Sequence, residues 1–362
     1  MDSLPVAATV VPARRPDLDL LRIASILGVV AIHVFSGIVA NADVTGSGSW
    51  WVAMVADIGS IWVVPVFVMV SGALVLAPRA HAEGPAGFYR KRLARIGWAF
   101  VFWQVCYDVV IFRWMSGNDL GLAQAAEYVW QGRGPHAHIY FLYLIVGLYA
   151  LAPVLYAFIA GNDRRARILA VVALTVTTVM YVGAAVLTAH GRQASLQLNA
   201  VTQGLPYVGY FVAGWALRDV VLRGGALWAT TVGTAGLLAF NIVLFARRAE
   251  ARDLFSVLPV NYLGPLVMLS AIGVFLLVKG WTADLRPAPG GARALSVLAD
   301  SVFGVFLVHM ALLLAGDRFI PGWQDLRTSV WWAALVTWLA CVVLSFLVSL
   351  AARRVRYVDR LF

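Results

Sequence analysis

The chain has 362 residues, of which 61% are hydrophobic and 13% are charged, and its formal net charge is +10. A soluble domain this apolar would expose a continuous hydrophobic surface, so the composition excludes an ordinary soluble enzyme. The apolar residues fall in runs of about 20, the length of a bilayer-spanning helix, and not in the short alternating segments of a β-barrel. We therefore predict an all-α, polytopic integral membrane protein with about ten transmembrane helices and no nucleic-acid partner.

Ten apolar segments are predicted to span the bilayer as helices. In chain order they are residues 20–40, 50–77, 93–113, 138–160, 166–188, 204–221, 226–246, 261–280, 296–315 and 330–352. The second segment contains Asp57 and Pro65, which predict a tilt or a kink. In the loop of residues 114–137, the run AQAAEYVWQG predicts a short helix at the membrane interface. No two segments show clear self-similarity, so the inverted repeat of many transporters is not visible.

The basic residues are distributed unevenly between the loops. If the N-terminus is cytoplasmic, most of the 28 lysine and arginine residues lie on the cytoplasmic side, as the positive-inside rule requires. We predict cytoplasmic termini, with an N-terminal segment 1–19, a membrane domain 20–352 and a basic tail 353–362. One basic cluster falls on the outer side: Arg247, Arg248 and Arg252. It either helps to bind an anionic acceptor or shows that one span is miscounted. We expect a multi-pass protein of the cell membrane, in a bacterium the inner or plasma membrane.

The first predicted helix carries ionisable residues that lipid disfavours. Asp19 and Arg22 lie near its start, and His33 lies deep inside it. Eleven residues separate Arg22 from His33, so both lie on one face, roughly 16 Å apart along the helix axis. His33 is either a neutral histidine hydrogen-bonded between helices or a general base. Arg22 is either an interfacial arginine paired with Asp19 or part of the same functional face.

A second group of charges lies in FYRKRLARI, residues 88–96, where the third helix begins. Arg92 and Arg95 are three residues apart and share a helix face, and Arg90 and Lys91 extend them to a cationic patch. The patch either follows the positive-inside rule and contacts lipid head groups, or it clamps a phosphate-rich ligand, because guanidinium groups bind phosphate bidentately.

In combination these motifs resemble the membrane acyltransferase-3 family, integral-membrane O-acyltransferases that modify carbohydrates and lipids. The resemblance rests on Arg22 and His33 in an R-x10-H arrangement after LDLLR, and on Arg92 and Arg95 in an R-x-x-R. It continues in order through PVFVMVSGALVL (65–76), HIYFLYLIVGLYALAP (138–153), YFVAGWALR (210–218) and SVFGVFLVHM (301–310). Tyr140 stands where the family pattern has tryptophan, and Phe306 stands where it has tyrosine.

The resemblance implies transfer of an acyl group, usually acetyl from acetyl-CoA, to a hydroxyl of a surface polysaccharide or a lipid-linked sugar. The residues it implies for donor binding are Arg22, Arg90, Arg92 and Arg95. The catalytic residues it implies are Asp19, Arg22 and His33, with His33 as general base or as a transient acyl carrier. An alternative acceptor is a small secondary metabolite. An alternative from a different class is a secondary transporter in which intramembrane histidine and aspartate relay protons.

Four further polar residues are candidates for the substrate-binding side. His138 and His309 are expected to line the acceptor side. Ser36 and Ser71 either donate hydrogen bonds to the developing oxyanion or bond between helices. His136 and His138 form an H-x-H pair without an apparent third ligand, so no metal cofactor is predicted.

Overall fold

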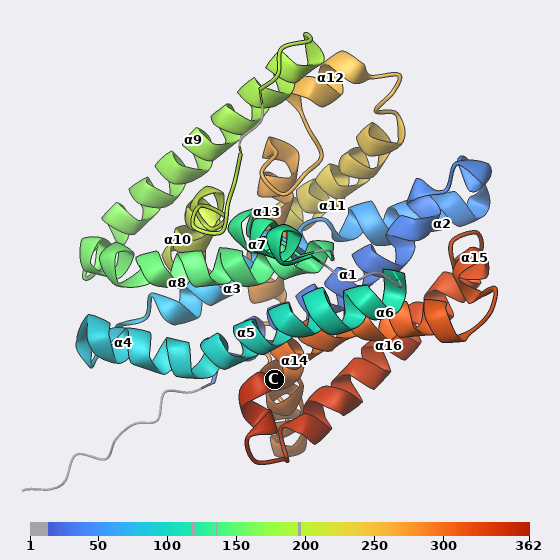
Figure 1. The fold of residues 1–362 in the computed structure, drawn as a ribbon. Helices are drawn as coiled ribbons and strands as arrows, with labels where there is room; N and C mark the ends of the chain where they lie inside the picture. The colour runs from blue at the N-terminus through green and yellow to red at the C-terminus, as the bar shows by residue number, and fades with distance from the viewer. Residues whose placement is uncertain (1–13, 117–120, 135, 195–196) are drawn as a thin grey trace, which may run out of the picture.

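The structure, a computed structural model, describes residues 14–116, 121–134, 136–194 and 197–362. These ranges are helical throughout the bundle and contain no strand (Figure 1). Eight helices in the described ranges are long and apolar enough to cross a membrane, which confirms the predicted fold class. Residues 1–13 of the predicted N-terminal segment lie outside the described residues.

Sixteen α-helices are described; α2 and α3 together form one span, and α4, α5 and α6 together form another. They are α1 (Pro16–Ala40), α2 (Gly48–Asp57), α3 (Val63–Val75), α4 (Gly84–Arg92), α5 (Trp98–Val105), α6 (Phe112–Ser116), α7 (Leu122–Trp130), α8 (Tyr140–Ile159), α9 (Asp163–Ala189), α10 (Val208–Ala216), α11 (Gly224–Ala246), α12 (Arg252–Val257), α13 (Pro265–Trp281), α14 (Pro289–Phe319), α15 (Trp323–Arg327) and α16 (Trp331–Ala352). The helix predicted within AQAAEYVWQG is α7.

The outer surface of the bundle is apolar, as a lipid-exposed surface requires. Only 11% of the most apolar stretch of α9 and 17% of that of α11 is buried, against 61% for α14. α9 and α16 lie on opposite sides of the bundle (Figure 1). Their exposed large hydrophobic side chains are mostly valine and leucine, and in water they would form a large hydrophobic patch. Lipid tails are the solvent in which this surface is stable.

α1 lies at the centre of the bundle, where it packs against α2, α3, α13, α14 and α16. The main hydrophobic core contains side chains from α1, α3, α5, α8, α10 and α14, and α9, α13 and α16 contribute to it as well. The three ionisable residues singled out on α1, Asp19, Arg22 and His33, are therefore carried by a helix that is surrounded by other helices.

Two predicted spans are interrupted locally. α2 ends at Asp57, and a 3₁₀ turn at Ile58–Ser60 precedes α3, which confirms the predicted kink. Pro65 falls in the first turn of α3, where its missing N–H has no intrahelical partner to lose. The third span, Gly84–Trp114, contains two π-helical segments, Leu93–Gly97 and Cys106–Ile111. Such wide turns often occur at functional sites.

The sixth predicted span is shorter than residues 204–221. α10 has nine residues after a 3₁₀ turn at Leu205–Tyr207, and nine residues rise about 14 Å, roughly half the hydrocarbon core. It is buried against α3 because glycines let the two backbones meet. A methyl group added at Gly72 would lie 1.7 Å from the Phe211 carbonyl oxygen, and one added at Gly214 would lie 1.8 Å from the Met69 carbonyl oxygen.

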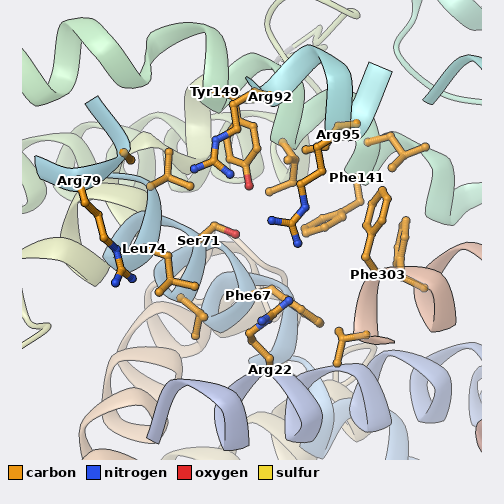
Figure 2. Close-up of a pocket in the computed structure, with 18 residues that line it drawn as sticks. Arg22, Phe67, Ser71, Leu74, Arg79, Arg92, Arg95, Phe141, Tyr149 and Phe303 are labelled. Atoms are coloured by element: carbon orange, nitrogen blue, oxygen red, sulfur yellow. The ribbon is translucent and has the colours of Figure 1, made fainter. Parts of the chain in front are cut away.

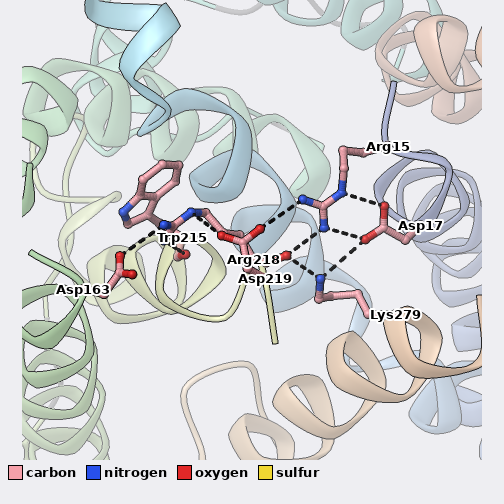
Figure 3. Close-up of polar contacts among 7 residues, drawn as sticks. All are labelled: Arg15, Asp17, Asp163, Trp215, Arg218, Asp219 and Lys279. Carbon is pink, nitrogen blue, oxygen red and sulfur yellow. Dashed lines mark hydrogen bonds and ion pairs between the residues drawn. The ribbon is translucent and has the colours of Figure 1, made fainter. Parts of the chain in front are cut away.

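Ion pairs connect several helix ends at the face of the bundle where α1, α9, α11 and α14 begin. We call this the N-terminal face. Figure 3 shows a chain of ion pairs there, and it connects α1, α9, α13 and the end of α10. Its members are Arg15, Asp17, Asp163, Arg218, Asp219 and Lys279. Lys279 is 1% exposed and donates to the Arg218 carbonyl oxygen as well as to Asp17, so its buried charge is paired and hydrogen-bonded.

Candidate functional site

A cavity of about 370 Å³ lies near the N-terminal face, between α1, α3, α4, α8 and α14. Four arginines line it: Arg22, Arg79, Arg92 and Arg95. Figure 2 shows the guanidinium groups of Arg22, Arg92 and Arg95 directed into one space, with Ser71 on its wall. We call this space the arginine cavity.

The local fold explains why two arginines of one motif reach the same wall. Arg92 ends α4, and Arg95 lies in the π-helical segment that follows. Residues three apart are neighbours on a helix, and the wide π turn carries both side chains toward the cavity. The Arg92 guanidinium carbon lies 5.3 Å from the ring centroids of both Phe88 and Tyr149. Stacking occupies the flat face of the guanidinium and leaves its N–H groups free for an anion.

The charges in the arginine cavity are only partly neutralised by the protein. Arg22 lies 3.9 Å from Asp19 and 3.9 Å from Asp300. In the described part of the chain, none of Arg79, Arg92 and Arg95 forms an ion pair with a carboxylate. Guanidinium groups in a recess with apolar walls attract anions strongly, because the surrounding side chains screen charge less than water does.

Two residues predicted for this region lie outside the cavity, and one that was not predicted lines it. Arg90 has a side chain that is 79% exposed, and it lies 3.6 Å from Glu83. Asp19 accepts a 2.6 Å hydrogen bond from Arg14 and supports the start of α1. Arg79 lines the cavity from the turn after α3, where only its position in a basic loop could have indicated it.

The turn that carries Arg79 is anchored by His81. The His81 ring is stacked between Phe88 and Tyr156, with centroids 4.7 Å and 4.1 Å away. Its Nε2 lies 3.0 Å from the Val75 carbonyl oxygen at the end of α3. Burial lowers the pKa of His81 below its ordinary value of 6.5. The neutral ring therefore helps to hold the wall of the arginine cavity in place.

A second cavity of about 260 Å³ adjoins the first, and we call it the histidine cavity. Its polar lining consists of His33, His138, Tyr140 and Tyr262. The His309 ring lies against them, with its centroid 5.3 Å from that of His33 and 5.5 Å from that of His138. The fold thus brings three histidines from α1, α14 and the turn before α8 to one place. In the described ranges, no group of three or more histidine, cysteine or acidic residues is arranged to hold a metal ion.

The hydrogen bonds of His309 determine which ring nitrogen carries the proton. Nδ1 lies 2.7 Å from the carbonyl oxygen of Phe306 and 3.2 Å from that of Val305. Carbonyl oxygens only accept hydrogen bonds, so Nδ1 is the donor and Nε2 of the neutral ring keeps its lone pair. Nε2 is buried and has no hydrogen-bond partner in the described part of the protein. His309 can therefore accept a hydrogen bond or a proton within the histidine cluster.

The two serines are placed differently. Ser71 lines the arginine cavity from α3. Ser36 lines neither cavity, and its hydroxyl donates to the His33 carbonyl oxygen at 3.4 Å, one turn back on α1. Of the two candidate oxyanion donors, only Ser71 faces a space that a substrate could enter.

Three phenylalanines belong to the lining of both cavities, and they were not selected from the sequence. Phe67 on α3, Phe141 on α8 and Phe306 on α14 line the arginine cavity and the histidine cavity alike. The Phe67 and Phe141 ring centroids are 6.0 Å apart, and those of Phe141 and Phe306 are 5.2 Å apart. Their rings lie between the cationic and the imidazole sides of the site.

The sequence model of a family described as acyltransferase domain matches residues 15–354, nearly the whole chain. The chain belongs to this family. It is therefore a membrane acyltransferase, and the match covers both cavities, including Arg22, His33, Arg92, Arg95 and His309. A search of curated proteins and a search of solved structures each gave no match to this acyltransferase.

Proposed function

We propose that this membrane acyltransferase transfers acetyl from acetyl-CoA to a hydroxyl group of a surface polysaccharide or a lipid-linked sugar. The observation that supports it best is the adjacency of the two cavities. One presents guanidinium groups that are only partly neutralised by carboxylates, and the other presents His33 and His138, with the His309 ring packed against both. An acyl donor with a polyanionic end and a distant thioester matches this pair of environments.

The donor would bind with its phosphates in the arginine cavity. Arg92 and Arg95 would bind them bidentately, with Arg22 and Arg79 completing the ring of positive charge. The positive-inside rule predicts that the N-terminal face is cytoplasmic, which is the side from which acetyl-CoA is available. Tyr149 keeps the Arg92 side chain in place by stacking, so little side-chain entropy is lost on binding.

The chemical step would take place beside His33. His33 would remove the proton from the acceptor hydroxyl as its oxygen attacks the thioester carbonyl carbon. The tetrahedral intermediate would then expel the CoA thiolate, which takes up a proton to give the thiol. His309, whose Nε2 keeps a lone pair, would accept a hydrogen bond from the His33 ring and orient it. A covalent acyl-histidine formed on His33 is the alternative route.

The acceptor would occupy the histidine cavity. Tyr140 and Tyr262 offer ring faces and phenol groups, which suit the apolar faces and hydroxyls of a sugar, and His138 adds a ring nitrogen. The lining is compact and uncharged, so a neutral acceptor hydroxyl fits it better than an anionic group.

Transfer to a cell-surface glycan tests the proposal. The protein is expressed in a host that lacks surface O-acetylation, and extracted glycans are examined by mass spectrometry for added acetyl groups. The expected result is acetylation with the wild type and its loss with His33→Gln. Labelled acetyl-CoA supplied to purified protein and extracted glycolipid identifies the donor. An acetylated glycan that persists in the His33→Gln strain would contradict the role of His33, and transfer without any dependence on acetyl-CoA would contradict the donor.

A further inference from the structure

The two cavities share three lining residues among those described, and all three are phenylalanines. Phe67, Phe141 and Phe306 come from three different helices, yet each contributes to both linings. Phe306 is 6% exposed, and its ring contacts that of Phe141. Among the described residues, no charged side chain is common to the linings of the two cavities.

A membrane protein with a cavity on each side of such a point has to prevent ions and protons from leaking between them. The arginine cavity adjoins the N-terminal face, whereas His138 and Tyr262 lie in the turns before α8 and α13, which begin toward the opposite face. If water filled both cavities without a break, ions and protons would cross the bilayer through the enzyme. An apolar constriction stops this because a charge or a file of water molecules loses its hydrogen bonds there.

We propose that Phe67, Phe141 and Phe306 form an apolar gate that blocks water, protons and phosphate groups but admits the acyl-thioester end of the donor. The blocking part of this inference depends only on the two cavities. The admitting part rests on the proposed acetyl-CoA donor. Aromatic side chains held by ring contacts, without hydrogen bonds, can turn aside for an uncharged chain and close behind it.

The gate also assigns a chemical task to the three rings. Water that reached the thioester would attack its carbonyl carbon and release acetate and the CoA thiol, so the donor would be lost without transfer. By keeping the constriction dry until the acyl end fills it, the gate favours the acceptor hydroxyl over water. The ratio of hydrolysis to transfer therefore becomes a measure of gate closure.

Proton flux through the protein tests the gate without any donor or acceptor. Full-length protein is reconstituted in vesicles that contain a pH-sensitive dye, and proton entry is driven by a potassium diffusion potential. The informative pair is Phe141→Gln and Phe141→Met, because the two side chains have similar length and only one is polar. We expect vesicles with the wild type or Phe141→Met to take up protons slowly, and vesicles with Phe141→Gln to take them up several-fold faster. Phe67→Gln and Phe67→Met repeat the comparison on α3.

Phe275 supplies the control, since it is fully buried on α13 and lines neither cavity. Phe275→Gln should leave proton flux unchanged if it folds, and size-exclusion chromatography selects folded variants for comparison. If Phe141→Gln and Phe67→Gln are folded and conduct protons no faster than the wild type, the proposed gate is wrong. If they conduct protons while the wild type does not bind acetyl-CoA, the gate is supported and acetyl-CoA is excluded as the donor. With acetyl-CoA present, Phe141→Gln should raise hydrolysis relative to transfer, and an unchanged ratio would remove the thioester-protecting task.

Discussion

Replacement of Arg95 by alanine removes one of the three guanidinium groups in the arginine cavity that form no ion pair with a carboxylate among the described residues. A hydrogen bond to a charged group contributes about 1.5–3 kcal/mol, so the loss of this contact should weaken acetyl-CoA binding roughly 10- to 150-fold. Arg92→Ala should cost at least as much, since it also removes a side chain fixed over Phe88 and Tyr149. Isothermal titration of purified protein in detergent measures the dissociation constant directly, and the effect should shrink as salt is raised.

Two further variants separate a specific site from general surface charge. Arg164 lies at the same face at the start of α9, is exposed and lines neither cavity, so Arg164→Ala should bind acetyl-CoA as the wild type does. Arg90 is mostly exposed and close to Glu83, so Arg90→Ala should have a much smaller effect than Arg95→Ala. Equal losses in all of these variants would refute the cavity assignment and leave only the net positive charge of the face as the attraction.

The remaining predictions concern the scaffold that holds the two cavities. Gly214→Ala places a methyl group 1.8 Å from a carbonyl oxygen of α3 and should markedly lower the midpoint temperature of thermal unfolding in detergent. Gly236 has open space around it, so Gly236→Ala should leave this temperature unchanged. Equal midpoint temperatures for the two variants would disprove the close packing of α10 against α3. Because burial lowers the pKa of His81, this residue binds a proton more readily in the unfolded chain than in the folded protein. The free energy of unfolding should therefore fall as the pH drops below about 6.5. His81→Phe should remove that part of the pH dependence. Arg327→Ala leaves the buried Asp317 carboxylate unpaired and should cost about 3–5 kcal/mol, with partial recovery when Asp317→Leu is added.

The sequence predicted the helices well because the bilayer imposes a length and a composition that can be read locally. All ten predicted segments contain a helix, and the kink between α2 and α3 follows from Asp57 and Pro65. The length of α10 was missed because it depends on a partner. Its apolar run is long enough to cross a membrane, yet Gly72 and Gly214 let it pack as a short helix against α3, and this fit is a tertiary property.

The candidate site was predictable to the extent that its residues share a helix or a motif. Periodicity places Arg22 and His33 on one face, and it pairs Arg92 with Arg95. The meeting of His33 with His138 and His309 depends on how distant helices pack. The same is true of the phenylalanine gate: each of the three phenylalanines lies in a segment that carries the family resemblance, but nothing in the sequence shows that their rings meet. Chain topology, and not residue type, separates them from the rest.

The geometry of α1 also bears on the class of donor. α1 is one unbroken helix from Pro16 to Ala40, so eleven residues place Arg22 and His33 roughly 16 Å apart along its axis. A donor that contacts both must carry its anionic group and its acyl group at the two ends of a long arm, as acetyl-CoA does. Acetyl phosphate carries both groups on one oxygen, so it could occupy the arginine cavity only with its acyl group on the wrong side of the gate. We therefore expect acetyl phosphate to compete weakly with acetyl-CoA for binding and to support no acetyl transfer. If acetyl phosphate supported transfer at a rate comparable to that with acetyl-CoA, Arg22 and His33 would not act on one donor molecule.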